Sequence, residues 1–193
     1  MEISNVRLAE PSESLRQAYL DFMADFAAAG QTLSKSRQPA QGESFAQFVQ
    51  RLNDAPTATN LPPHLVPGTM WWLMDGDVVV GVFQLRHWLT PALEAYGGHI
   101  GYVVAPSHRR KGYATRGLEL VLDECRRMGL DRVLITCNKD NIASARVIQK
   151  CGGVLENEGV DPSDGMPTQR YWIELAPAGL GFWVQNGEDD RQI

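Results

Sequence analysis

Cysteine is scarce in this chain, and its spacing fits no metal site. The three cysteines are Cys125, Cys137 and Cys151, and none lies at a paired metal-ligand spacing from another. We therefore expect no metal. An odd number of cysteines without an export signal also predicts reduced thiols, as in a cytoplasmic protein.

Long apolar runs and an excess of basic residues are missing too. No apolar run approaches the length of a membrane span, and the first residues lack a basic stretch followed by an apolar one. We expect a cytoplasmic protein without a membrane partner. The formal net charge of −5 argues against a nucleic-acid partner, although a local basic cluster leaves that as a weak third hypothesis. With 193 residues, the chain suits one domain over 1–176, followed by a Gly-rich acidic tail over 177–193.

Two common phosphate-binding motifs are absent. A Walker-type loop requires Gly-Lys-Ser/Thr, whereas this chain has Lys111-Gly112-Tyr113. The dinucleotide-binding spacing G-x-G-x-x-G does not occur either.

What the chain does contain is an alternation of strand and helix patterns. Asp75-Gly76-Asp77, between two β-rich runs, predicts a hairpin. The predicted strands cover residues 1–10, 70–75, 78–89, 97–106, 131–138, 153–159 and 168–175. Helical apolar spacing predicts helices over 11–30, 45–55, 112–128 and 141–153. This interleaving indicates a mixed sheet in an α/β or α+β fold.

The segment SHRRKGYATRG places Arg109, Arg110 and Lys111 at the start of the third predicted helix. A helix N-terminus carries roughly half a positive charge, so cations are unfavourable there. They become favourable when an anion such as a pyrophosphate binds the unpaired amides of the first turn. Gly112 has no side chain and lets an anion approach the backbone. The alternative is a solvated basic turn.

Two motifs resemble the GNAT acetyltransferase superfamily. VVAPSHRRKGYA is similar to its acyl-CoA-binding motif Arg/Gln-x-x-Gly-x-Gly/Ala, matched by Arg109, Gly112 and Ala114. About thirty residues on, NKDNIASARVIQKCGGV resembles its second signature, an Asn-initiated helix ending in Lys-x-Gly. Together they cover about residues 97–155, and HIGYVVAP with NIASARVIQK looks closest to the ribosomal-protein alanine acetyltransferases.

The resemblance implies a fold and a co-substrate. The fold is a splayed, mostly antiparallel sheet of about six to seven strands with helices on both faces. Acetyl-CoA would lie between the strands over 97–104 and 131–138. By carry-over, its contacts would be the backbone of two strand residues, the turn and helix start, and two residues of the second signature: Val103, Val104, Arg109, Arg110, Lys111, Gly112, Tyr113, Ala114, Thr115, Asn141 and Ser144. Asn141 also fits a purely structural role as a helix N-cap.

The chain departs from the family at two catalytic positions. The Glu that usually precedes Ile-Gly-Tyr is His99 here, and the position of a common Tyr general acid is Ile148. His99 is the candidate base by position and intrinsic pKa, or else a strand histidine hydrogen-bonded within the sheet. Glu94 is a second candidate base, or an exposed loop carboxylate. Tyr102 lines the cleft, or packs in the sheet.

The resemblance implies an N-acetyltransferase that acts on a primary amine of a small molecule or peptide, as a monomer or homodimer. The alternative is an acyl-CoA-binding sensor or scaffold without turnover. On the family layout, the loops over 30–44 and 159–167 flank the acceptor end of the cleft. Asp161 and Asp164 would attract a cationic amine, although turn formation explains both residues equally well.

Overall fold

The computed structural model describes residues 5–59, 61–62 and 65–175. The predicted tail over 177–193 and the first four residues of the first predicted strand lie outside these ranges. The other predicted helices and strands are all present, with shifts of a few residues at their ends.

The first half of the chain forms a four-stranded antiparallel sheet in the order β1-β2-β3-β4. Its strands are β1 (Val6–Ala9), β2 (Gly68–Asp75), β3 (Val78–Arg86) and β4 (Ile100–Val104). The predicted hairpin joins β2 to β3, and Gly76 supplies the positive φ of 57° that its tight turn requires.

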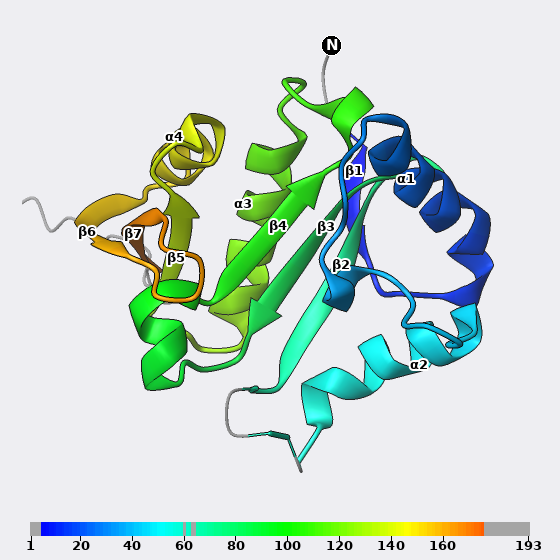
Figure 1. Cartoon of the computed structure of the whole chain (residues 1–193), viewed down its shortest axis with the longest axis horizontal. Coiled ribbons are helices and arrows are strands. Elements are labelled where there is room, and N and C mark those ends of the chain that lie inside the picture. Colours follow the sequence, from blue (N-terminus) through cyan, green and yellow to red (C-terminus); the bar gives the residue numbers. More distant parts are fainter. Residues whose placement is uncertain (1–4, 60, 63–64, 176–193) are drawn as a thin grey trace, which may run out of the picture.

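Helices cover both faces of this sheet (Figure 1). On one face, α1 (Arg16–Ala28) and α2 (Phe45–Asp54) bury aromatic side chains against β2 and β3. On the other face, α3 (Tyr113–Arg127) packs closely because Gly117 has no side chain, and a Cβ there would lie 2.2 Å from the Phe83 ring. Helices thus pack on both faces of the sheet, and β4 forms one of its two edges.

The second half forms a separate three-stranded antiparallel sheet in the order β5-β7-β6. It contains β5 (Arg132–Asn138), β6 (Val154–Val160) and β7 (Pro167–Glu174), with α4 (Ile142–Lys150) between β5 and β6. The splayed mixed fold is confirmed, and the predicted sheet is divided into two. Short helical turns complete the fold: η1 (Glu13–Leu15), η2 (Lys35–Arg37), η3 (Ala55–Thr57), η4 (Leu93–Gly97) and η5 (Pro106–His108).

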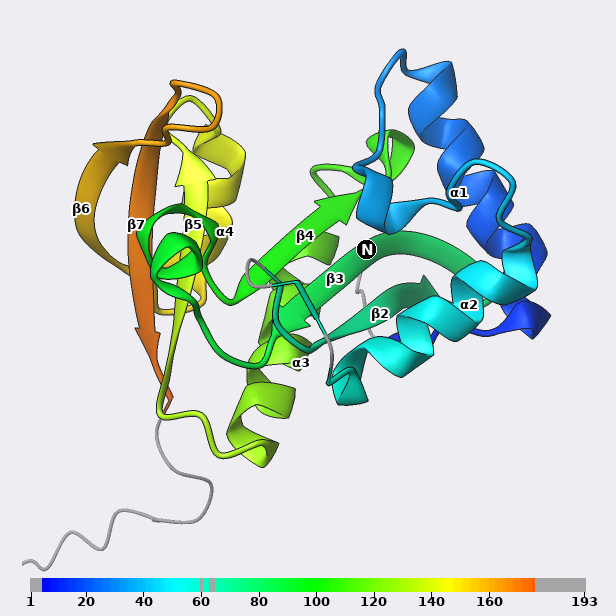
Figure 2. The ribbon, with the colours of Figure 1, turned by 60° about the horizontal axis from the view of Figure 1, so that its bottom comes forward.

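The two sheets meet at His99, just before β4, where it is hydrogen-bonded to β5. Figure 2 shows β4 and β5 diverging from each other. His99 N donates to Leu134 O at 2.7 Å, and Leu134 N donates to His99 Nδ1 at 2.9 Å. Gly98 makes this approach possible, because a Cβ there would lie 2.7 Å from Leu134 O. We call this junction the vertex.

Across the described ranges, no helix is long and apolar enough to cross a membrane. Within the same ranges, no group of three or more His, Cys, Asp or Glu residues is arranged to hold a metal ion.

Candidate active site

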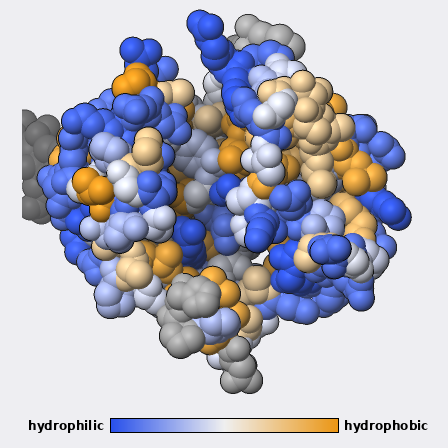
Figure 3. Space-filling view, viewed as in Figure 1, coloured by the Kyte–Doolittle hydropathy of each residue, from blue (hydrophilic) through white to orange (hydrophobic). Residues whose placement is uncertain are grey.

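A cleft of about 630 Å³ opens between β4 and β5, where the two sheets diverge. Figure 3 shows this face of the molecule hollowed between its two lobes. The cleft is lined by Arg37, Ile100, Gly101, Tyr102, Ile135, Thr136, Cys137, Asn138, Asp140, Asn141, Ser144 and Met166. The lining thus combines two strands, the start of α4, and one residue from each of two distant loops.

The turn between β4 and α3 presents unpaired backbone amides. Gly112 is the N-cap of α3 with φ 93°, and no side chain caps the helix. The first helical bond is donated by Arg116 N to Gly112 O at 3.0 Å, so the three amides before Arg116 have no helical acceptor. Arg110 also has a positive φ of 62°, which an ordinary residue adopts only at a cost. This geometry, at the start of a 15-residue helix, suits an anion.

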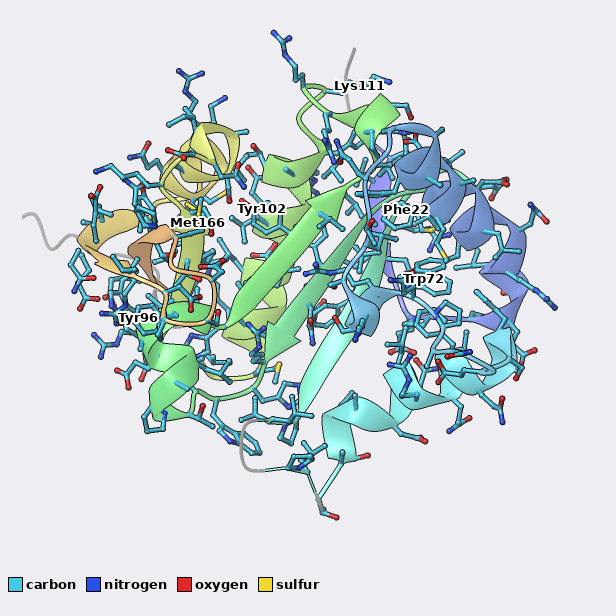
Figure 4. All side chains as sticks on the ribbon, in the orientation of Figure 1. Phe22, Trp72, Tyr96, Tyr102, Lys111 and Met166 are labelled. Carbon is cyan, nitrogen blue, oxygen red and sulfur yellow. The ribbon has the colours of Figure 1, made fainter. Side chains whose placement is uncertain are left out.

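The three cations of this turn have different roles. Arg109 is exposed, but hydrogen bonds hold its side chain: its Nε donates to Val104 O at 3.1 Å and its Nη2 to Gln31 Oε1 at 2.7 Å. Its guanidinium also lies 5.7 Å from the centre of the Phe26 ring. Arg110 and Lys111 are exposed, and Lys111 extends from the tip of the turn in Figure 4. The Arg109 side chain is therefore engaged in bonds that hold the turn. The side chains of Arg110 and Lys111 are exposed and are free to contact an anion bound at the turn.

The side chain of Tyr113 belongs to the core and not to the turn surface. It is 6% exposed, and its hydroxyl donates to a carboxylate oxygen of Asp75. The backbone amides of Tyr113, Ala114 and Thr115 remain at the helix start, so any contact of these residues with an anion would be made by the main chain.

Tyr102, Asn141 and Ser144 lie together in the cleft. Tyr102 OH lies 2.9 Å from Ser144 Oγ, and the Tyr102 ring stacks on Phe83 with centroids 5.3 Å apart. Asn141 Oδ1 accepts from Ser144 N at 3.1 Å, so Asn141 caps α4 and also lines the cleft. Burial raises the pKa of Tyr102 to about 12, and this keeps the hydroxyl protonated at neutral pH. Figure 4 shows Tyr102 between the two lobes.

His99 lies at the vertex and is not among the residues that line the cleft. It is 8% exposed, and its Nδ1 lone pair accepts the Leu134 N–H. Burial and the nearby Arg86 lower its pKa to about 4, so the imidazole is neutral and carries its proton on Nε2. With Nδ1 engaged and Nε2 protonated, the ring has no free lone pair with which to take a proton. The geometry matches the structural alternative for His99.

Two other positions also lie away from the cleft. Glu94 is exposed on the short helix η4, and Ile148 is fully buried in the core, in contact with the backbone of Gly153. A side chain at position 148 therefore packs inside the protein. The loop carboxylates Asp161 and Asp164 accept hydrogen bonds within their own turn, from Ser163 and Met166 respectively.

Sequence reasoning missed several residues that line the cleft, above all Arg37, Cys137 and Asp140. Arg37 and Met166 come from the two loops that were expected to flank the cleft, so the loops were identified but not the residues. Cys137 lies in the mostly apolar run of β5, and an apolar strand does not reveal which of its residues line a cleft and which lie in the core. Burial raises the pKa of its thiol, which is therefore neutral at neutral pH.

Comparisons with known proteins place this fold and site in a family. A model of the GNAT acetyltransferase domain matches residues 6–154, which include the turn, the cleft strands and α4. The chain belongs to the GNAT acetyltransferases.

A curated relative and several solved structures are similar to this chain. An uncharacterized N-acetyltransferase YnaD of Bacillus subtilis (strain 168) is 38% identical over 115 residues, which are 58% of this chain. The match spans about half of that relative, 56% of its length. An acetyl transferase of Salmonella typhimurium that modifies the N-terminal serine of ribosomal protein L7/L12 has a TM-score of 0.63 at 19% identity, over 91% of this chain and 98% of its own. The microcin C7 self-immunity acetyltransferase MccE, solved with acetyl-CoA and AMP, has a TM-score of 0.59 at 16% identity, over 89% and 93%.

Proposed function

We propose that this protein is an acetyl-CoA-dependent N-acetyltransferase that acts on a primary amine. The observation that carries the proposal is the uncapped start of α3, which lies at the end of β4, the strand that forms one wall of the cleft. The pyrophosphate of acetyl-CoA fits the free amides after Gly112, with Arg110 and Lys111 as its counter-charges.

The protonation states of the cleft residues support this chemistry. For a Lys-like amine with a pKa of about 10.4, being neutral at pH 7 costs roughly 4.6 kcal/mol, whereas releasing a thiolate of pKa about 8.5 costs roughly 2 kcal/mol. Acetyl-CoA, when bound, supplies the activated acetyl thioester. The Tyr102 hydroxyl, protonated and beside Ser144, can donate a hydrogen bond to the sulfur as it leaves.

Loss of the amine proton needs a separate route, because His99 has no free lone pair. We propose that the proton leaves through water in the open cleft. Asp140 is the one carboxylate among the lining residues, and it is exposed to that water. All three cysteines are free thiols, which supports the expected cytoplasmic location.

Release of free CoA tests the proposal. The protein is incubated with acetyl-CoA and a panel of primary amines, and CoA is detected with a thiol reagent. Amine-dependent release supports the enzyme. A rise in melting temperature with acetyl-CoA, but no release with any amine, would favour the sensor or scaffold alternative.

A further inference from the structure

Arg37 is built firmly into one wall of the cleft. It ends the short helix η2, and its carbonyl oxygen accepts the hydroxyl of Tyr19 at 2.6 Å. Tyr19 is fully buried and stacks on Trp72 with ring centroids 4.2 Å apart. The backbone of Arg37 is therefore anchored to the core between α1, α2 and the sheet.

The guanidinium of Arg37 is not satisfied by the groups around it. Its Nε is buried and has no hydrogen-bond partner among the residues that the structure describes, and its Nη1 makes a long contact of 3.4 Å with Ser34 Oγ. Its Nη2 lies over Gly101, where a Cβ would be 3.2 Å away, so the glycine on β4 leaves room for it. A planar cation with unused donors therefore faces the cleft at β4.

Arg37 also lacks a counter-charge. Among the ion pairs of the described residues, none includes Arg37 or its neighbour Arg86. Arg86 instead donates to the carbonyls of Gly97 and Gly98, at 3.1 and 2.9 Å. Burial lowers the pKa of Arg37; Tyr19 partly offsets this by raising the pKa, and the nearby Arg86 lowers it by a smaller amount. Asp140 lines the cleft from the end of β5 but forms no ion pair with Arg37 within the described residues.

We infer that the acceptor is a small amine that carries an oxyanion, a carboxylate or a phosphate, and that Arg37 binds this group. The inference rests on the proposed acetyltransferase function and adds the substrate class. The guanidinium fork matches two oxygens of either anion, and binding would supply the partner that Nε lacks. Arg37 and Tyr102 both line the cleft, so an anion held by Arg37 would keep the amine of a short acceptor within the same cavity as Tyr102.

The positive charges of Arg37 and Arg86 oppose the binding of a cationic acceptor, the class of acceptor that Asp161 and Asp164 predict from the sequence. A polyamine would bring a second positive charge toward Arg37 and Arg86. A monoamine that carries an oxyanion avoids this repulsion, because its oxyanion pairs with the guanidinium.

Matched amine pairs test the inference in the wild-type protein. β-Alanine is compared with β-alaninamide, and phosphoethanolamine with ethanolamine, while putrescine represents a dication. Rates are expressed per neutral amine, using the titration of each compound. We expect kcat/KM to be at least about tenfold higher for the oxyanion member of one pair, which identifies carboxylate or phosphate as the preferred group.

Variants then assign the effect to Arg37. Arg37→Met should lower kcat/KM about tenfold or more for the oxyanion member and less than about threefold for its uncharged partner. Arg37→Lys should retain part of the preference, because the charge remains without the fork. Lys35→Met is the matched control: it removes one positive charge from the exposed side of the same helix and should leave both rates within about twofold.

The outcomes separate this inference from the proposed function. If uncharged or dicationic amines are acetylated as well as oxyanions, and Arg37→Met does not change the ranking, the inference is wrong and the acetyltransferase stands. If no amine is acetylated, the proposed activity fails, and thermal shifts decide the inference. The melting temperature is measured with CoA alone and with CoA plus N-acetyl-β-alanine or N-acetyl-phosphoethanolamine. A further rise with an N-acetyl compound that Arg37→Met abolishes supports the inference, and no further rise with either compound overturns it.

Discussion

The turn before α3 and the Arg37 wall of the cleft are built from different chemical groups. At the turn, which contributes no residue to the cleft lining, the groups are backbone amides exposed by a strand–turn–helix of contiguous sequence. At the Arg37 wall, they are side chains from η2, the segment after β5 and the β6–β7 loop. A site made of main chain can be recognised from a short sequence pattern, whereas a site made of distant side chains becomes visible only in three dimensions.

Among the substitutions that test this difference, the largest effect is expected at Gly112. Gly112→Glu places an anion and a strained backbone at the amides, so the acetyl-CoA melting shift should disappear and kcat/KM for acetyl-CoA should fall more than about a hundredfold. Gly129→Glu is the matched control, since Gly129 also has positive φ, 77°, but lies after the other end of α3. A normal acetyl-CoA shift in Gly112→Glu, measured by differential scanning fluorimetry, would rule out the amide site.

The next largest effect is expected at Tyr102, which lines the cleft from β4. Tyr102→Phe should lower kcat about 10–100-fold, because the hydrogen-bond donor is lost while the ring keeps its stack on Phe83. The KM for acetyl-CoA should stay within about twofold. Tyr96→Phe removes a hydroxyl from η4, outside the cleft, and should leave kcat unchanged. Equal rates for Tyr102→Phe and the wild type would show that the leaving sulfur needs no donor from this residue.

His99 is expected to affect stability and not the proton transfer. Its pKa is lowered to about 4 from 6.5, so the folded protein binds fewer protons than the unfolded chain between these values. Its contribution to stability, up to about 3 kcal/mol, is complete above pH 6.5 and is lost as the pH falls toward 4. Urea unfolding at several pH values should show this loss.

Two variants at position 99 complete that test. His99→Leu leaves the buried Leu134 N–H without an acceptor and should cost about 1–3 kcal/mol at pH 7. His99→Asn keeps an acceptor that does not titrate, and should remove this pH dependence. A kcat profile that loses an inflection near pH 6.5 in either variant would instead support His99 as the base.

The smallest effects are expected in the β6–β7 loop. Asp161 and Asp164 accept turn hydrogen bonds from Ser163 and Met166, so their carboxylates already have partners. Changing both to Asn should leave the KM for the acceptor within about twofold, because Asn also forms such turns. A large rise in that KM with a cationic amine would contradict the anionic acceptor and restore the expectation drawn from the sequence.

Local signals predicted the fold and one end of the site. Helical spacing, the Asp75-Gly76-Asp77 turn and the Gly112 turn all act within a few residues, so their geometry follows from the neighbouring chain. The sequence offered two alternatives for His99 and did not identify its hydrogen-bond partner, because Leu134 lies 35 residues away and belongs to the other sheet. Arg37 resembled any polar loop residue, and its unpaired Nε depends on the packing of Tyr19 and β4 around it.

Because the two sheets are joined at the vertex, a rotation about His99 would change the distance between them farther along β4. β4 rises about 3.3 Å per residue, so its five residues form an arm of about 15 Å. A rotation of about 5° about His99 would change the width at the far end of the arm by about 1 Å, close to the tolerance of a hydrogen bond. At this point the two sheets are held together by two hydrogen bonds, 2.7 and 2.9 Å long, between His99 and Leu134. A substitution there changes the angle at which the two walls present their groups to each other, without touching any atom that reacts.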